Sequence, residues 1–349
     1  MTAVMNSRDA QADDDVQTKD STEIKALVFV RDRGIVVLWI VLILAFSMWA
    51  SPFFGTWGNA VLIANAAAVA ALYAAGVGVG VMSGALDISI PGVAALAGVV
   101  CGKLVTSQVS VGIGIVLALL VGVSVGIVNG LIALRGYNPL IITIGTLSVT
   151  SGLAAVVSGG YAIPGLTQLT FMGTARYLGL PAPVWIVIVL YTVLTVFITQ
   201  TRHGLRFMAV GGNMEAVRRC GINSSVYRVL GFAIGGLCAA LGGVVSAAVS
   251  SEANPSASPG IIFTALTAVA LSGVALTGGR GSLPRVLVGA LILATISNAL
   301  TIKGIQPYWS TIVTGLLLLF ALGMESSVKT AVERRLMKAA TASAHSGRR

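Results

Sequence analysis

The stretch SVGIGIVLALLVGVSVGIVNGLIAL, residues 110–134, contains no charged side chain in 25 consecutive positions. An α-helix of this length is about 37 Å long, and the hydrocarbon core of a bilayer is about 30 Å thick. The apolar residues follow one another continuously instead of alternating with polar ones, which excludes a membrane β-barrel. The stretch therefore predicts a transmembrane α-helix.

Similar apolar runs recur along most of the chain. Of its 349 residues, 56% are hydrophobic and 10% are charged, whereas soluble domains carry about 25% charged residues. The 42 glycines fit the close packing of helices in lipid. We expect an all-α polytopic membrane protein with about ten transmembrane helices, near residues 34–50, 59–82, 90–106, 110–134, 139–158, 182–199, 228–250, 260–279, 284–302 and 308–325.

The basic residues predict the orientation of the chain. With both termini in the cytoplasm, 19 of the 22 lysines and arginines fall on the cytoplasmic side, and only Lys103, Arg176 and Lys303 fall outside. The positive-inside bias of membrane proteins favours this orientation. The net charge of +10 is therefore explained by topology, and we expect membrane lipid and no nucleic acid as a partner.

The charge distribution also divides the chain into three parts. Residues 1–33 are polar and predict a disordered cytoplasmic tail. This acidic tail lacks the basic segment that begins a signal peptide, so the first span is expected to be an uncleaved anchor. Residues 34–325 form the predicted membrane domain, with a polar cytoplasmic loop at 200–227, and residues 326–349 form a basic cytoplasmic tail.

No motif in the chain indicates an enzyme. The G-x-x-x-x-G-K-[ST] run that cradles nucleotide phosphates is absent, as are hydrolase and metalloprotease motifs. His203 and His345 lie far apart, and Cys101, Cys220 and Cys238 lack the spacing of metal ligands. We expect no catalytic residues, no metal, no cofactor of the chain's own and three free thiols.

A single carboxylate stands out among the predicted spans. Asp87, in the stretch SGALDISIPG (83–92), is the only acidic residue from 33 to 214. Gly84 and Pro91 break the helix on either side of it, and backbone groups freed at membrane depth are tolerated only against protein or water. A carboxylate at such a place is a candidate functional residue.

Three roles remain open for this carboxylate. Asp87 or Ser89 could cap the following helix, which has Pro91 in its first turn. Asp87 could contact a solute or ion, or it could pair with an arginine such as Arg280.

The predicted spans also hold several uncharged polar residues, which are consistent with a neutral, hydroxyl-rich solute. Serines within helices often bond back to their own backbone, which is the alternative to a role in transport. The candidate pathway or structural residues, with Asp87, are Asn65, Ser83, Ser89, Ser148, Thr150 and Thr267.

The polar loop contains a small, well-specified helix within GGNMEAVRRCGIN, residues 211–223. It has an N-cap, an acidic first turn, a basic last turn and a terminal glycine, which are Asn213, Glu215, Arg218, Arg219 and Gly221. A helix of about seven residues does not persist alone in water. It either closes two spans or serves as a docking element for a cytoplasmic partner.

Four segments resemble one family. GGNMEAVRRCGIN, after TRHGLRFMAV, resembles the cytoplasmic coupling loop of the permease subunits of bacterial sugar ABC importers. These importers are of the ribose/xylose/arabinose/galactoside type, within the branched-chain amino-acid permease superfamily. SGALDISIPGVAALAG looks like the family's G-G-[IL]-D-L-S-V-G segment. NGLIALRGYNPLIITIGTLSVTSGLA and LTAVALSGVALTGGRGSLPRVLVGALI are similar to two further segments, so the resemblance spans about residues 35–325.

The resemblance implies a transport subunit of the bacterial cytoplasmic (inner) membrane. Two permease subunits, identical or different, would form the pathway for a monosaccharide or related polyol, and an extracytoplasmic binding protein would deliver it. A cytoplasmic ATPase would bind ATP and Mg and dock on the coupling loop. The implied coupling residues are Arg202, Gly204, Arg206, Gly211, Gly212, Asn213, Glu215, Ala216, Arg218 and Gly221. A nucleoside, a branched-chain amino acid or a signalling furanose remains an alternative solute, and a stand-alone secondary carrier an alternative class.

Overall fold

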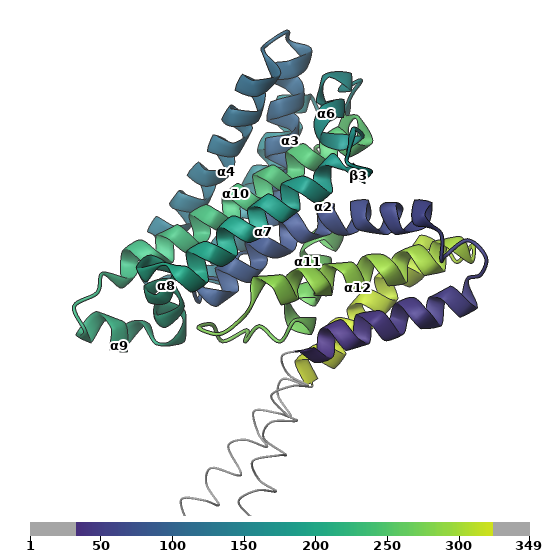
Figure 1. The fold of residues 1–349 in the computed structure, drawn as a ribbon. Helices are drawn as coiled ribbons and strands as arrows, with labels where there is room; N and C mark the ends of the chain where they lie inside the picture. The colour runs from purple at the N-terminus through teal and green to yellow at the C-terminus, as the bar shows by residue number, and fades with distance from the viewer. Residues whose placement is uncertain (1–32, 324–349) are drawn as a thin grey trace, which may run out of the picture.

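The computed structural model describes residues 33–323, and these are almost entirely helical (Figure 1). Ten longer helices occupy the positions of the ten predicted spans. They are Arg33–Trp49, α2 (Trp57–Met82), α3 (Ile90–Thr106), α4 (Val111–Ala133), α5 (Pro139–Ser158), α7 (Ala182–Gln200), α10 (Ser224–Ser250), α11 (Pro259–Leu271), α12 (Leu283–Ile302) and Pro307–Gly323. Six of them, α2, α4, α5, α7, α10 and α12, are long and apolar enough to cross a membrane, and the other four are shorter.

The all-α membrane class is thereby confirmed, while the number of crossings and their direction stay predictions. The predicted tails, 1–33 and 326–349, lie outside the described residues apart from Arg33.

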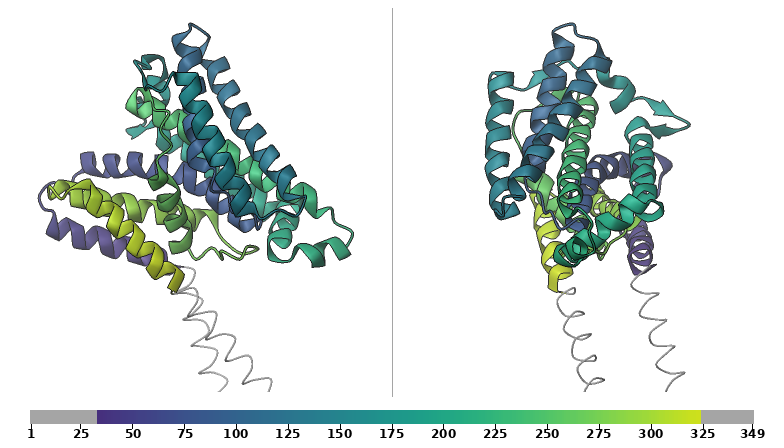
Figure 2. Two further views of the ribbon diagram at one scale, coloured as in Figure 1. Left: turned by 180° about the vertical axis from the view of Figure 1, so that it is seen from behind. Right: turned by 90° about the vertical axis from the view of Figure 1, so that its left-hand side faces the viewer.

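The short elements gather at two opposite ends of the bundle (Figures 1 and 2). One end holds η1 (Thr167–Leu169), α6 (Thr170–Gly173), and the strands β1 (Ile163–Pro164), β2 (Arg176–Tyr177), β3 (Leu180–Pro181) and β4 (Glu252–Ala253). β1 pairs antiparallel with β4, and β2 with β3. The other end holds α8 (Arg202–Gly212) and α9 (Met214–Arg219). α10 runs from one end to the other and contacts α8 and α9 near its start and α6 and β4 near its end.

α10 forms the centre of the bundle and packs along α4, α3 and α2. Glycines allow this close approach. A Cβ at Gly126 of α4 would overlap the backbone of Phe232 on α10, and a Cβ at Gly122 would lie 2.5 Å from the Cβ of Ala240. In lipid the hydrophobic effect does not drive helices together, so close van der Waals packing between small residues stabilises such crossings instead.

Two boundaries differ from the predicted ones by more than two residues. α10 begins at Ser224 instead of 228, since the Oδ1 of Asn223 accepts a hydrogen bond from the backbone N–H of Ser225 (3.2 Å). α11 ends at Leu271 instead of 279 because Gly273 adopts a φ of +70°. A left-handed glycine leaves the helix there.

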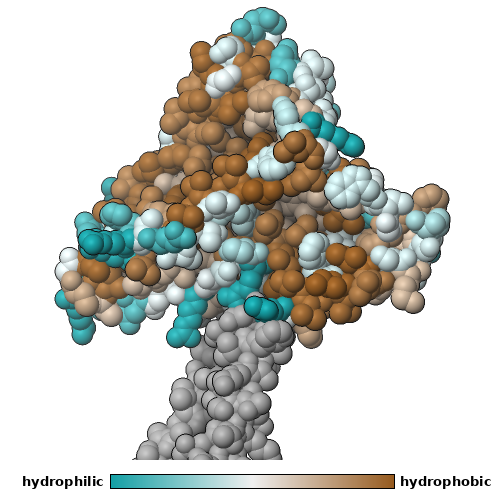
Figure 3. All heavy atoms as spheres, in the orientation of Figure 1, coloured by the Kyte–Doolittle hydropathy of each residue, from teal (hydrophilic) through white to brown (hydrophobic). Residues whose placement is uncertain are grey.

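The surface is sorted by polarity. Hydrophobic side chains cover the flanks of the bundle, and hydrophilic ones gather around α8 and α9 (Figure 3). On α4 the large apolar side chains exposed at the surface are Ile113, Val116, Leu117, Leu120, Ile127, Val128 and Leu131. An apolar flank with a polar end is the pattern of a helix bundle whose sides face lipid.

Candidate functional site

The predicted small helix is present as α9, with its caps in place. Asn213 is the N-cap, and its Oδ1 accepts a hydrogen bond from the backbone N–H of Ala216 (2.9 Å). Gly221, two residues past the end, has a φ of +76°. The helix has six residues, one fewer than predicted.

The charged residues of α9 pair with one another. A carboxylate oxygen of Glu215 lies 2.8 Å from an Arg218 guanidinium nitrogen, and the other lies 3.3 Å from Nε of Arg219. The Arg218 and Arg219 side chains are 70% and 78% exposed. Exposed pairs of this kind contribute at most about 1 kcal/mol to stability. These charges therefore remain available to a partner at little cost to the fold.

The structure adds a helix that the sequence interpretation missed. α8 begins at Arg202, with the Oγ1 of Thr201 accepting a hydrogen bond from the N–H of Gly204 (2.9 Å). Gly204 is buried, and a Cβ there would overlap the carbonyl oxygen of Phe197 on α7. Arg202 and Arg206 are exposed, one turn apart.

α8 rests directly on the end of α2 through backbone atoms. A Cβ at Gly211 would overlap the carbonyl oxygen of Met82, and it would lie 2.9 Å from the N–H nitrogen of Gly279. That N–H of Gly279 donates a hydrogen bond to the same Met82 oxygen (3.0 Å). We call Met82, Gly211 and Gly279 the backbone junction. It joins α8, the end of α2 and the turn between α11 and α12.

The ten implied coupling residues are thus of two kinds. Gly204 and Gly211 pack inside this chain and position α8. The exposed ones are Arg202, Arg206, Gly212, Asn213, Glu215, Ala216, Arg218 and Gly221.

Asp87 lies in a buried polar network that spans three segments. It is 2% exposed, and its Oδ1 accepts hydrogen bonds from the N–H (2.8 Å) and the hydroxyl (2.5 Å) of Ser89. The Nδ2 of Asn129 on α4 donates to the Ser89 hydroxyl (3.1 Å). The hydroxyl of Thr146 on α5 donates to the Oδ1 of Asn129 (2.6 Å). We call these four residues the Asp87 network.

The network bears on two of the roles considered for this carboxylate. Ser89 is the N-cap residue of α3, with Pro91 in the first turn, but its side chain makes no cap hydrogen bond and its hydroxyl binds Asp87 instead. Asp87 accepts the N–H of Ser89 itself, before the first residue of α3, and so orders the turn that leads into this helix. Within residues 33–323, Asp87 forms no ion pair with Arg280.

Asn129 and Thr146 were not singled out from the sequence. The signal for Asn129 was its amide within the most apolar of the predicted spans, four residues before the end of α4.

The remaining predicted pathway residues do not form one site. Most bond to their own helix: Ser83 to the carbonyl of Gly80 (2.8 Å), Ser148 to Ile144 (3.3 Å), Thr150 to Thr146 (2.7 Å) and Thr267 to Phe263 (2.7 Å). The buried Oδ1 of Asn65 has no partner among the described residues.

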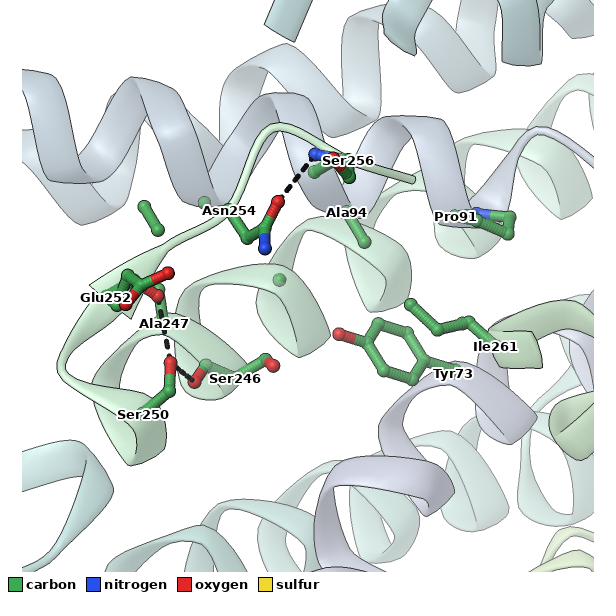
Figure 4. Close-up of a pocket in the computed structure, with 14 residues that line it drawn as sticks. Tyr73, Pro91, Ala94, Ser246, Ala247, Ser250, Glu252, Asn254, Ser256 and Ile261 are labelled. Atoms are coloured by element: carbon green, nitrogen blue, oxygen red, sulfur yellow. Dashed lines mark hydrogen bonds between the residues drawn. The ribbon is translucent and has the colours of Figure 1, made fainter. Parts of the chain in front are cut away.

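A cavity with several polar side chains in its wall lies elsewhere, between α2, α3, α10, the start of α11 and the segment 252–256 (Figure 4), and we call it the polar cavity. Its volume is about 110 Å³, and its wall includes Tyr73, Pro91, Ser246, Glu252, Asn254 and Ser256. Ser246 and Ser250 in its wall belong to the last turns of α10, at the end away from α8 and α9. The run of polar residues after the span ending at Ser250 was the available signal for it.

No metal centre accompanies these sites. Among residues 33–323, no group of three or more histidine, cysteine, aspartate or glutamate residues could hold a metal ion.

A bundle with six helices long and apolar enough to cross a membrane and with a polar helix pair at one end fits a multi-pass membrane protein. The chain belongs to the family described as branched-chain amino acid transport system / permease component, whose model matches residues 59–322.

The chain is similar to several sugar permeases of Escherichia coli. It is 31% identical over 288 residues to the ribose import permease protein, covering 81% of this chain and 90% of that one. It is 34% identical over 291 residues to the L-arabinose transport system permease protein, with 82% and 88% covered. It is 30% identical over 288 residues to the D-allose transport system permease protein, with 82% and 88% covered. No solved structure matches the chain significantly.

Proposed function

We propose that this chain is the permease subunit of an ATP-binding-cassette importer for a monosaccharide or a related polyol. The observation that carries the proposal is the similarity to permeases for ribose, arabinose and allose, which extends over four-fifths of this chain and about nine-tenths of theirs. Three different sugars among the relatives favour the solute class and leave the individual sugar open.

The motor of the importer is a separate cytoplasmic ATPase that supplies the bound ATP and Mg and docks on α8 and α9. Two observations support this assignment. α8 and α9 project from one end of the bundle with exposed arginines (Figures 1 and 3). α8 also contacts the end of α2 through the backbone junction. A displacement of α8 by the ATPase would therefore be transmitted to α2.

The membrane arrangement follows from the same assignment. The helices cross the bacterial inner membrane ten times, with both termini and α8–α9 in the cytoplasm. The opposite end of the bundle then faces outward and receives the solute from a binding protein. A second permease subunit, identical or related, completes the pathway.

Reconstitution in proteoliposomes tests the function. The chain, its ATPase and its binding protein are assembled, and uptake of radiolabelled D-ribose, L-arabinose, D-allose and L-leucine is measured with and without ATP. The expected result is ATP-dependent uptake of at least one of the sugars. Uptake of leucine alone, or uptake by the lone chain driven by an ion gradient, would overturn the proposal.

A further inference from the structure

The polar cavity is built from parts of the bundle that meet only in the fold. Tyr73 comes from the middle of α2, Pro91 from the first turn of α3, and Ser246 from the last turns of α10. Tyr73 is 6% exposed, and its ring packs against α10 at Gly242, where an added Cβ would overlap the ring atoms. Its hydroxyl points into the cavity (Figure 4).

Asn254 supplies a hydrogen-bonding group on the opposite wall. Its Oδ1 accepts a hydrogen bond from the N–H of Ser256 (2.8 Å), which fixes the side chain and turns its Nδ2 toward the cavity (Figure 4). No described residue accepts a hydrogen bond from that Nδ2. Because Asn254 is exposed, this oriented donor is open to water or to an acceptor that is not part of this chain.

The wall chemistry selects against charged ligands. No lysine, arginine or histidine lines the cavity, and its one ionisable acid is Glu252. An anion such as a sugar phosphate would meet a carboxylate and no cation. Hard metal ions need several oxygen ligands with more than one carboxylate as a rule. Hydroxyl and amide groups beside the apolar Pro91 and Ile261 suit a molecule with hydroxyl groups and a C–H face.

The Asp87 network holds the buried end of the cavity in place, next to Pro91. Ser89 lies two residues before Pro91, and its hydrogen bonds to Asp87 and Asn129 hold the start of α3 against α4. Pro91 and Ala94 then form the inner wall. Glu252, Asn254 and Ser256 are exposed at the other end of the cavity. The cavity therefore runs from the buried start of α3 to the surface away from α8 and α9.

We infer that this cavity is a binding site for the transported solute, with Tyr73 and Asn254 as its hydrogen-bonding side chains and a neutral polyhydroxylated molecule as its ligand. The inference rests on the proposed function, and it places the solute at residues other than the polar ones first singled out in the spans.

The test uses the complete reconstituted importer with the sugar that the wild type imports. Tyr73→Phe and Asn254→Ala each remove one hydrogen-bonding group, and Tyr137→Phe, in the exposed turn between α4 and α5, is the matched control. We expect sugar imported per ATP hydrolysed to fall about 3- to 10-fold for the two cavity variants, the size of one hydrogen bond. The recovery of the assembled complex with its ATPase should match that of Tyr137→Phe, which a misfolded variant would not show.

A second readout reports occupancy directly. Cys220 is exposed while Cys101 and Cys238 are buried, so Asn254→Cys is made in a Cys220→Ser background. A membrane-impermeant maleimide should label the new thiol from outside, and the imported sugar should slow that labelling.

The reconstitution distinguishes a wrong proposed function from a wrong solute site. If the wild type imports no sugar, the proposed function is wrong. If it imports sugar while both cavity variants match Tyr137→Phe and the sugar gives no protection, the solute site lies elsewhere and this inference is overturned.

Discussion

Asn59 on α2 and Asn298 on α12 exchange two side-chain hydrogen bonds: each Nδ2 donates to the other Oδ1, at 3.0 and 2.8 Å. Both helices are apolar enough to span a membrane. Interhelical hydrogen bonds there contribute about 0.6 kcal/mol on average and up to about 2 kcal/mol. The pair joins α12 to α2 at the start of α2, far along the helix from the backbone junction at Met82.

Replacing Asn298 by leucine should destabilise the protein, because Asn59 is buried and its Oδ1 loses its hydrogen-bond donor, while its Nδ2 keeps the carbonyl oxygen of Phe54 (3.0 Å). An unsatisfied buried amide costs about 1–3 kcal/mol. Thermal unfolding of the purified protein in detergent checks this. Thr301→Val is the control, since Thr301 lies on the same helix, is exposed and bonds only to its own backbone at Ser297. Equal melting temperatures for both variants would contradict the role of the pair.

Gly211→Ala should disrupt the backbone junction, because the added methyl group overlaps the carbonyl oxygen of Met82. Overpacking of this kind costs about 1–3 kcal/mol. The neighbouring Gly212→Ala is the control, since its Cβ would meet the Cα of Gly279 at an ordinary 3.7 Å. Limited proteolysis of the α8–α9 region should accelerate in the first variant only. The same cleavage rate in both would show that α8 does not depend on this contact.

Glu215→Lys should weaken the ATPase complex without unfolding the permease. The side chain is 52% exposed, and its ion pairs contribute at most about 1 kcal/mol to the fold. Co-purification with the ATPase is measured against Arg135→Glu, an exposed charge reversal in the turn between α4 and α5. If Glu215→Lys retains the ATPase as well as this control does, α9 is not the docking helix.

Asn129→Leu should destabilise the start of α3, because it removes the central member of the Asp87 network. Asn129 is fully buried, and its loss leaves the hydroxyl of Thr146 and the Ser89–Asp87 pair without their link. The expected cost is about 1–3 kcal/mol. Ser148→Ala, at an exposed position of α5, should change stability by less than about 0.5 kcal/mol. Denaturation in detergent distinguishes the two, and equal midpoints would refute a supporting role for the network.

The sequence was most informative where structure depends on neighbouring residues. Uninterrupted apolar runs placed all ten longer helices, since each satisfies its own backbone in lipid. α9 was predicted because Asn213 and Gly221 cap it locally. α8 was missed because its apolar residues, such as Phe207 and Val210, are buried only by contacts with other helices, which the local sequence does not indicate.

The sites were predicted less completely for the same reason. Asp87 stood out as a lone carboxylate, but its partners on α4 and α5 lie about 40 to 60 positions further along the chain. Hydroxyls such as Ser83 and Thr267 looked like pathway groups, although they mainly bond to their own helices. The cavity combines residues of four helices, α2, α3, α10 and α11, and of the segment 252–256, and no local pattern brings those segments together.

The backbone junction has a mechanical consequence. Met82 and Tyr73 lie on the same helix, nine residues and about 13 Å apart along its axis. The contact at Met82 is made by backbone atoms, so no change of side-chain rotamer can absorb a movement of α8. α2 can move as a rigid helix. Its end at Met82 contacts α8, which leads to the proposed ATPase, and its residue Tyr73 forms part of the cavity wall. A displacement imposed on α8 would change the shape of that wall in a single step, with no chain of intermediate side chains to relay it.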